Sequence, residues 1–123
     1  MKRPVTVLIV DDDFDVRETL ADVLRDEGYL VAVAVDGIDA LEYLRANEAP
    51  ALILLDWMMP RMDGAQFRVE QEKDPKMASV PVLLLTADAR TAEKARSLRA
   101  QAYLKKPVKL EALLAAIALH TAA

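Results

Sequence analysis

Residues 52–55 form an aliphatic run, Leu-Ile-Leu-Leu, which ends abruptly at the carboxylate of Asp56. Apolar residues without polar interruption over this length predict a strand buried on both faces, as in a parallel sheet covered by helices. Pro60 cannot continue a sheet ladder, and Asp63-Gly64 is typical of a turn before a helix. Asp56 is therefore expected at the carboxyl end of a buried strand, where open α/β sheets bind their ligands. On its own, Asp56 could equally cap the following turn.

The rest of the chain repeats this alternation of strand and helix. Strands are expected at residues 5–10, 30–35, 52–56, 82–86 and 102–105. Helices are expected from about Val16 to a stop at Gly28, from Ile38 to before Pro50, at about 64–73, at about 90–99, and from Leu110 with Leu113, Leu114 and Ile117 facing inward. Such alternation predicts right-handed crossovers and an α/β, doubly wound, flavodoxin-like parallel sheet of five strands in the order 2-1-3-4-5. We expect one domain spanning residues 1–123.

The composition of the chain excludes several kinds of site and partner. The formal net charge of −4 argues against nucleic-acid binding, which needs a clustered basic face. The lack of cysteine excludes disulfides and thiolate metal sites, and the three glycines are too far apart to build a nucleotide-binding loop. The first apolar run has only strand length, so we expect no signal peptide, no membrane span and a cytoplasmic location.

Chemically reactive side chains stand at four of the predicted strand ends. Asp11 and Asp12 follow the first strand, Asp56 ends the third, Thr86 ends the fourth and Lys106 follows the fifth. Three neighbouring carboxylates repel one another, and a set of oxygen ligands alone favours Mg²⁺, or Mn²⁺, over zinc. With one divalent cation and one ammonium, the formal charge of this cluster is zero. Such a site can accept a phosphoryl group on a carboxylate, and Asp56 is the central candidate.

Each of these residues also has a purely structural interpretation. Any of the aspartates at 11–13 could cap the following helix, and Asp13 is expected to be a cap or a solvated residue. Thr86 could simply favour an extended backbone because it is β-branched. Charge alone does not distinguish Lys106 from Lys105. The joint occurrence of these groups at successive strand ends nevertheless favours one shared site.

These motifs resemble the receiver domains of two-component response regulators, such as those of chemotaxis, from about Val5 to Leu119. The matching residues are the acidic pair Asp11-Asp12, the Asp-x-x-Met-Pro-x-Met-Asp-Gly signature at 56–64, Thr86-Ala87, and the Tyr-x-x-Lys-Pro signature at 103–107. Because the lysine of this family directly precedes a proline, the resemblance assigns its role to Lys106 and implies a cis bond to Pro107.

The resemblance implies a signalling domain that is not an enzyme, and that receives a phosphoryl group from a histidine kinase or a phosphotransfer protein. Asp56 would be the phosphoacceptor, with Mg²⁺ held by Asp12, Asp56 and the backbone carbonyl of Met58, and by Asp11 through a water. Lys106 would hold a phosphoryl oxygen.

The resemblance also implies a switch. Thr86 would move toward the phosphoryl group, Tyr103 would turn inward, and the face made by the fourth helix, the fifth strand and the fifth helix would change shape. That face would then bind a downstream protein or a second copy of the chain.

Departures from the family and rival interpretations leave some points open. Arg99-Ala100 stands where the family usually has Gly-Ala, and Met58 and Asp88, which tune the phosphoryl lifetime in the family, leave that lifetime open. A haloacid-dehalogenase-like phosphatase would need threonine or valine where Asp15 stands. A pseudo-receiver that binds partners without phosphorylation is disfavoured by the full set of reactive residues. The chain could also be the receiver of a larger transcription factor or hybrid kinase, although a methionine just before the first strand favours a true N-terminus.

Overall fold

The computed structural model describes residues 4–57, 59, 61–87 and 102–121. Five parallel strands form one sheet, in the order β2-β1-β3-β4-β5. The strands are β1 (Thr6–Val10), β2 (Leu30–Ala34), β3 (Leu52–Asp56), β4 (Val82–Thr86) and β5 (Ala102–Lys105). The predicted fold class and strand order are confirmed. The helix expected at about 90–99 lies outside the described residues.

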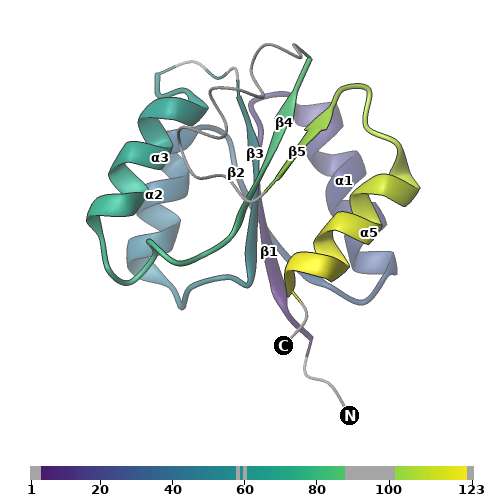
Figure 1. Cartoon of the computed structure of the whole chain (residues 1–123), viewed down its shortest axis with the longest axis horizontal. Helices are drawn as coiled ribbons and strands as arrows, with labels where there is room; N and C mark the ends of the chain where they lie inside the picture. The colour runs from purple at the N-terminus through teal and green to yellow at the C-terminus, as the bar shows by residue number, and fades with distance from the viewer. Residues whose placement is uncertain (1–3, 58, 60, 88–101, 122–123) are drawn as a thin grey trace.

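Helices cover both faces of the sheet (Figure 1). Two of them, α1 (Phe14–Asp26) and α5 (Leu110–Thr121), lie on one face, and α2 (Gly37–Ala46) and α3 (Gly64–Lys73) lie on the other. Alternate strand residues therefore enter different cores. The core under α1 and α5 includes Val7, Ile9, Leu52, Leu54 and Leu83, and the core under α2 and α3 includes Leu8, Val10, Ile53, Leu55 and Leu84. This burial on both sides explains why β1, β3 and β4 read as continuous aliphatic runs.

Local hydrogen bonds fix both ends of α1. The side chain of Asp13 accepts a hydrogen bond from the Val16 amide at 3.1 Å, so Asp13 is the N-cap, as expected. At the other end Gly28 has a φ of +95°, which is the left-handed conformation that glycine adopts without strain. The Tyr29 amide donates to the Leu24 carbonyl at 3.0 Å, which completes a Schellman motif. The predicted stop at Gly28 is confirmed.

One part of the predicted core is wrong. Leu113 and Ile117 of α5 are fully buried and Leu114 packs against the same core, but Leu110 is 49% exposed. Leu110 is the first residue of the helix, where the chain arrives from the loop at the edge of the sheet. Since α5 is apolar on nearly all sides, its hydrophobic pattern does not by itself select the buried face.

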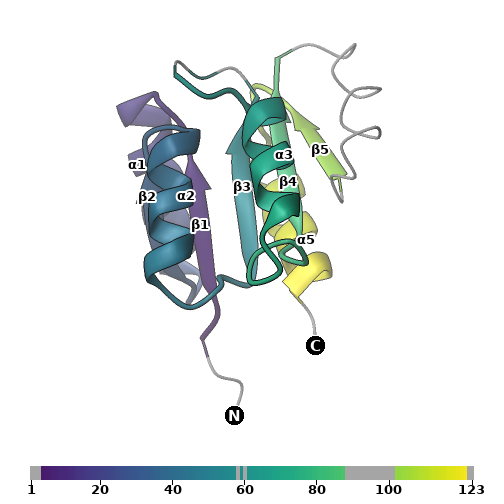
Figure 2. The same cartoon turned by 90° about the vertical axis from the view of Figure 1, so that its left-hand side faces the viewer.

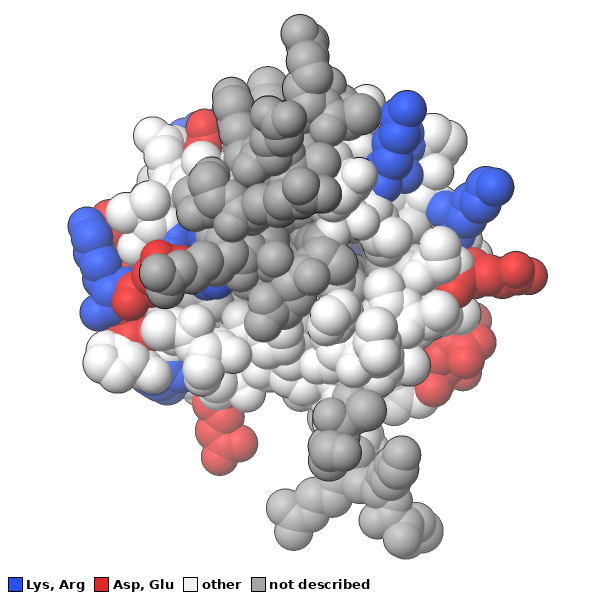
Figure 3. Space-filling model, viewed as in Figure 1, with Lys and Arg blue, Asp and Glu red and all other residues white. Residues whose placement is uncertain are grey.

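All five strands run in the same direction, so their carboxyl ends lie at one common edge of the sheet (Figure 2). In the face viewed in Figure 3, acidic and basic side chains lie mainly around the rim, and uncharged residues fill most of the remaining described surface. None of the helices in the described part of the chain combines the length and the apolar character that crossing a membrane requires.

Candidate functional site

The carboxyl edge of the sheet carries a cleft of about 270 Å³. It is lined by Asp11, Asp12, Asp13, Asp56, Trp57, Thr86, Ala87 and Lys106. Backbone hydrogen bonds continue the ladders up to this edge, with the Trp57 amide donating to the Leu85 carbonyl at 3.1 Å and the Lys106 amide donating to the Thr86 carbonyl at 2.7 Å. The residues that the sequence places at four strand ends therefore line one cleft.

Three carboxylates meet in this cleft. Asp11, Asp12 and Asp56 each offer an oxygen that lies within 4.8 Å of the other two. Asp11 is completely buried and Asp56 is 6% exposed, whereas Asp12 is open to solvent. Asp11 Oδ1 accepts a hydrogen bond from the Asp13 amide at 2.9 Å, but Asp11 Oδ2 is buried without a hydrogen-bond partner. Because a buried acceptor without a hydrogen bond is costly, Asp11 Oδ2 depends on positive charge in the cleft, which the Lys106 ammonium at 3.5 Å supplies in part and a bound cation would complete.

Lys106 is the cation of the site. Its Nζ lies 3.2 Å from Asp56 Oδ1 and 3.5 Å from Asp11 Oδ2. Partial burial disfavours the charged ammonium, but the charges of Asp56 and Asp11 and the hydrogen bond to Asp56 outweigh that effect, so the pKa of Lys106 is raised. The Lys106–Pro107 bond is cis, as the resemblance implies.

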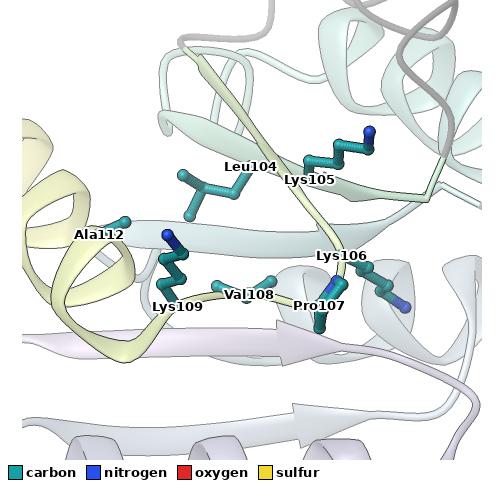
Figure 4. A pocket seen from close by; sticks show the side chains of 7 residues that line it. All are labelled: Leu104, Lys105, Lys106, Pro107, Val108, Lys109 and Ala112. Atoms are coloured by element: carbon teal, nitrogen blue, oxygen red, sulfur yellow. The ribbon is translucent and has the colours of Figure 1, made fainter.

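Lys105, by contrast, is exposed and does not line this cleft. A separate hollow of about 470 Å³ lies beside Leu104, Val108 and Ala112. Figure 4 shows the ammonium of Lys106 turned away from it. The structure therefore places Lys106, and not its neighbour, at the carboxylates.

The cluster fits a hard divalent cation. Three carboxylates and one ammonium carry a formal charge of −2 at neutral pH, and a single divalent cation neutralises it. The ligands are oxygens alone, which suits Mg²⁺ or Mn²⁺. Asp12, which is exposed at the mouth of the cleft, and Asp56, at its floor, could reach one ion together.

Arg17 supports the acidic turn, a contact that sequence reasoning missed. Its Nη1 donates a hydrogen bond to the Asp11 carbonyl at 2.9 Å, and the residue is only 8% exposed. The ring of Phe14, itself 64% exposed, lies 5.5 Å from the guanidinium carbon. An arginine in the first turn of the helix that follows an acidic strand end is a signal that could have suggested this contact.

Of the other residues predicted for the site, the structure describes Thr86 and Tyr103 but not Met58. Thr86 is 4% exposed at the end of β4, and Tyr103 on β5 is 42% exposed. The backbone carbonyl expected from Met58 lies outside the described residues. Gly64 brings the start of α3 close to the site, because a Cβ there would lie 3.3 Å from the Asp56 carbonyl oxygen and 3.2 Å from the Trp57 Cα.

Comparison with known proteins yields consistent matches. The pattern of the response regulator receiver domain matches residues 7–118. The response regulator MprA of Mycobacterium sp. (strain KMS) is 44% identical over 91% of this chain, which spans about half (48%) of that relative.

Solved structures agree with this match. A putative response regulator from Chloroflexus aurantiacus J-10-fl has 32% identity and a TM-score of 0.92, covering 98% of this chain and all (100%) of that one. The receiver domain of a sensor histidine kinase from Pseudomonas aeruginosa PAO1 has 25% identity and a TM-score of 0.89, covering 98% of this chain and 100% of that one. That structure has a magnesium ion coordinated in its active site cleft. The chemotaxis protein CheY4 of Vibrio cholerae has 29% identity and a TM-score of 0.87, covering 94% of this chain and 97% of that one.

Proposed function

The chain belongs to the response regulator receiver family, and from that premise we propose that Asp56 is the residue that accepts the phosphoryl group. Receiver domains are signalling modules of two-component systems, whose phosphoryl donor is a histidine kinase. The acidic site of Asp11, Asp12 and Asp56 is consistent with Mg²⁺-dependent phosphorylation. The observation that carries the proposal is the contact of Asp56 with Lys106 at the floor of a cleft that opens at the sheet edge.

In this proposal an oxygen of Asp56 attacks the phosphorus of a phosphohistidine. The new bond is the carboxyl O–P bond, and the P–N bond breaks with its electron pair staying on the histidine nitrogen. Lys106, which holds Asp56 Oδ1 at 3.2 Å, is close enough to take up a phosphoryl oxygen after transfer.

We assign the metal to Asp12, Asp56 and the Met58 carbonyl, with Asp11 acting through a water. When bound, Mg²⁺ (or Mn²⁺) neutralises charge on the carboxylates and on the transferred oxygens. The magnesium ion in the P. aeruginosa receiver supports this assignment.

We further propose that Thr86 and Tyr103 form the switch. A phosphoryl group on Asp56 presents new acceptor oxygens near the Thr86 hydroxyl, and a moving threonine would leave space for an aromatic side chain. Tyr103, Leu110 and Leu119 are all exposed on β5 and α5, so apolar surface is available there for a downstream protein or a second copy of the chain.

The partners and the extent of the protein belong to the same proposal. A histidine kinase or phosphotransfer protein would be the donor, in the cytoplasm, with no direct contact to nucleic acid or membrane. We propose a single receiver domain of residues 1–123. Since the curated relatives are about twice as long as this chain, the alternative is that this receiver is part of a larger regulator.

Reaction with acetyl phosphate tests the assignment. We expect the chain with Mg²⁺ to gain the mass of one phosphoryl group, and we expect Asp56→Asn and the chain with EDTA not to gain it. Asp13→Asn, which removes a neighbouring charge but retains an acceptor for the helix cap, should react like the unchanged protein. Phosphorylation of Asp56→Asn at the unchanged rate would show that the acceptor is another residue. A folded chain that never reacts would favour the pseudo-receiver.

A further inference from the structure

A charged contact joins two loops that lie far apart in the sequence. Loop 57–63 connects β3 to α3, and residues 58 and 60 of it lie outside the described residues. Within this loop, Arg61 Nε donates a hydrogen bond to Asp36 Oδ2, in the turn between β2 and α2. Asp36 is only 3% exposed, whereas the Arg61 side chain is 57% exposed. A solvent-facing arginine therefore anchors the loop to a buried carboxylate.

Asp36 is itself fixed by its surroundings. Its Oδ1 accepts a hydrogen bond from the Asp39 amide at 2.8 Å, which makes Asp36 the N-cap of α2. The next residues along the chain, Gly37 and Met62, also pack closely together. A Cβ on Gly37 would lie only 2.7 Å from Met62 Cγ. Loop 57–63 thus contacts the turn between β2 and α2 at two adjacent positions, Asp36 and Gly37.

The backbone of Arg61 depends on this support. Its φ of 61° lies in the left-handed region, which is unfavourable for a residue with a Cβ. Such a conformation persists only where neighbouring contacts hold it. The ion pair with Asp36, the contact of Met62 with Gly37 and the packing of Met62 against the core under α2 and α3 act on this part of the loop.

The same loop borders the candidate metal site. It begins directly after Asp56, and the Gly64 amide at its far end donates to the Trp57 carbonyl at 3.1 Å. Asp63 caps α3 through the Gln66 amide at 2.9 Å. Trp57 and Asp63, at the two ends of the loop, and Arg61 between them are therefore each held by a hydrogen bond. By its position in the chain, Met58, the source of the proposed backbone ligand, belongs to this loop.

We propose that Arg61 is a positioning residue for metal binding: by pairing with Asp36 it holds loop 57–63 in the conformation that the metal site requires. The inference rests on the proposed function, because it assumes that the loop contributes to that site. Arg61 acts through the loop backbone and touches neither the metal nor the phosphoryl group.

Magnesium titrations of the full chain test the inference, with Trp57 fluorescence and thermal stabilisation as readouts. Arg61→Gln removes the charge, and Asp36→Asn removes the partner charge while its Oδ1 can still cap α2. We expect each change to weaken Mg²⁺ binding about tenfold. This is the smaller of the losses in metal affinity that follow when a residue supporting a metal ligand is removed. The double variant should be no weaker than either single variant, since both changes break one contact.

Two further variants separate positioning from a general loss of stability. Arg61→Lys retains the cation and should recover part of the affinity. Arg61→Gly removes the pair together with the left-handed strain that the pair offsets, so it should stay folded and bind Mg²⁺ more tightly than Arg61→Gln. The matched control is Arg25→Gln, which breaks the exposed Arg25–Asp22 pair of α1 and should leave Mg²⁺ affinity unchanged.

The outcomes distinguish this inference from the proposed function. Unchanged Mg²⁺ affinity in Arg61→Gln, or in Asp36→Asn if the first variant does not fold, would overturn the inference while leaving the site intact. Absence of any Mg²⁺ response in the unchanged protein would instead contradict the proposed function.

Discussion

Replacing Asp12 by asparagine should stabilise the metal-free protein and abolish its response to Mg²⁺. The change removes one of three carboxylates whose ligand oxygens lie within 4.8 Å of one another. Asparagine has nearly the same shape, so the packing of the turn is retained. The same negative charge that would hold the metal therefore costs stability when no metal is bound, as is common for functional sites.

The size of the effect follows from the charges in the cleft. Asp11, Asp56 and Lys106 together carry a net charge of −1, so Asp12 meets about one uncompensated negative charge. Two unit charges 4.8 Å apart repel by about 0.9 kcal/mol at a dielectric constant of about 80 and by about 3.5 kcal/mol at about 20. Because Asp12 is exposed, the lower value applies. We expect a gain of about 1 kcal/mol, or roughly 3–5 °C in Tm.

Thermal unfolding with EDTA and with Mg²⁺ is the assay. At ten times its Kd, Mg²⁺ should stabilise the unchanged protein by about 1.4 kcal/mol and the Asp12→Asn variant hardly at all. The order of stability should therefore reverse when the metal is added. Asp13→Asn is the control, because it removes an adjacent charge outside the metal cluster and should retain the Mg²⁺ response. A metal-free Asp12→Asn variant less stable than the unchanged protein, or equally stabilised by Mg²⁺, would refute the reasoning.

Two other predictions concern the surroundings of the site. The hydrogen bond and the charge of Arg61 hold the pKa of Asp36 below its usual value of about 3.9, so Asp36 contributes stability above about pH 4 that is lost as the pH falls through the lowered pKa. The stability lost in Asp36→Asn, measured by urea unfolding, should therefore be larger at pH 7 than at pH 3, and an equal loss at both would contradict this. Thr86→Ala should still accept a phosphoryl group from acetyl phosphate but lose roughly 1.5–3 kcal/mol of coupling to the switch. Beryllofluoride should then shift the NMR signals of Tyr103 and α5 in the unchanged protein but not in the variant, and equal shifts in both would exclude Thr86.

Much of the fold is readable from the sequence because its three central strands, β1, β3 and β4, are buried on both faces. The run Leu52–Leu55 is fully buried, and its pattern cannot be mistaken for that of a half-exposed strand. Gly28 and Asp13 act locally at the ends of one helix, so their residue types were sufficient to predict them. The wrong prediction for Leu110 has the opposite cause, because an evenly apolar helix does not reveal which side is inward.

The site is predictable only where it follows from topology. Asp11, Asp56 and Lys106 each stand at a strand end, and a parallel sheet brings such ends together. The contact between Arg61 and Asp36 spans 25 residues and depends on how two loops pack, which no local pattern specifies. The buried contact of Arg17 with the Asp11 carbonyl likewise depends on the rotation of α1 against the sheet.

Chemical localisation of the phosphoryl group tests the central assignment most directly. After reaction with acetyl phosphate and Mg²⁺, radioactive borohydride reduces an acyl phosphate to an alcohol and marks the acceptor carboxylate, which peptide sequencing then identifies. The geometry of Asp56 beside Lys106 predicts label at residue 56 and none at residues 11–13. Label at Asp11, Asp12 or Asp13 in the unchanged protein would contradict the assignment of Asp56 as the phosphoacceptor.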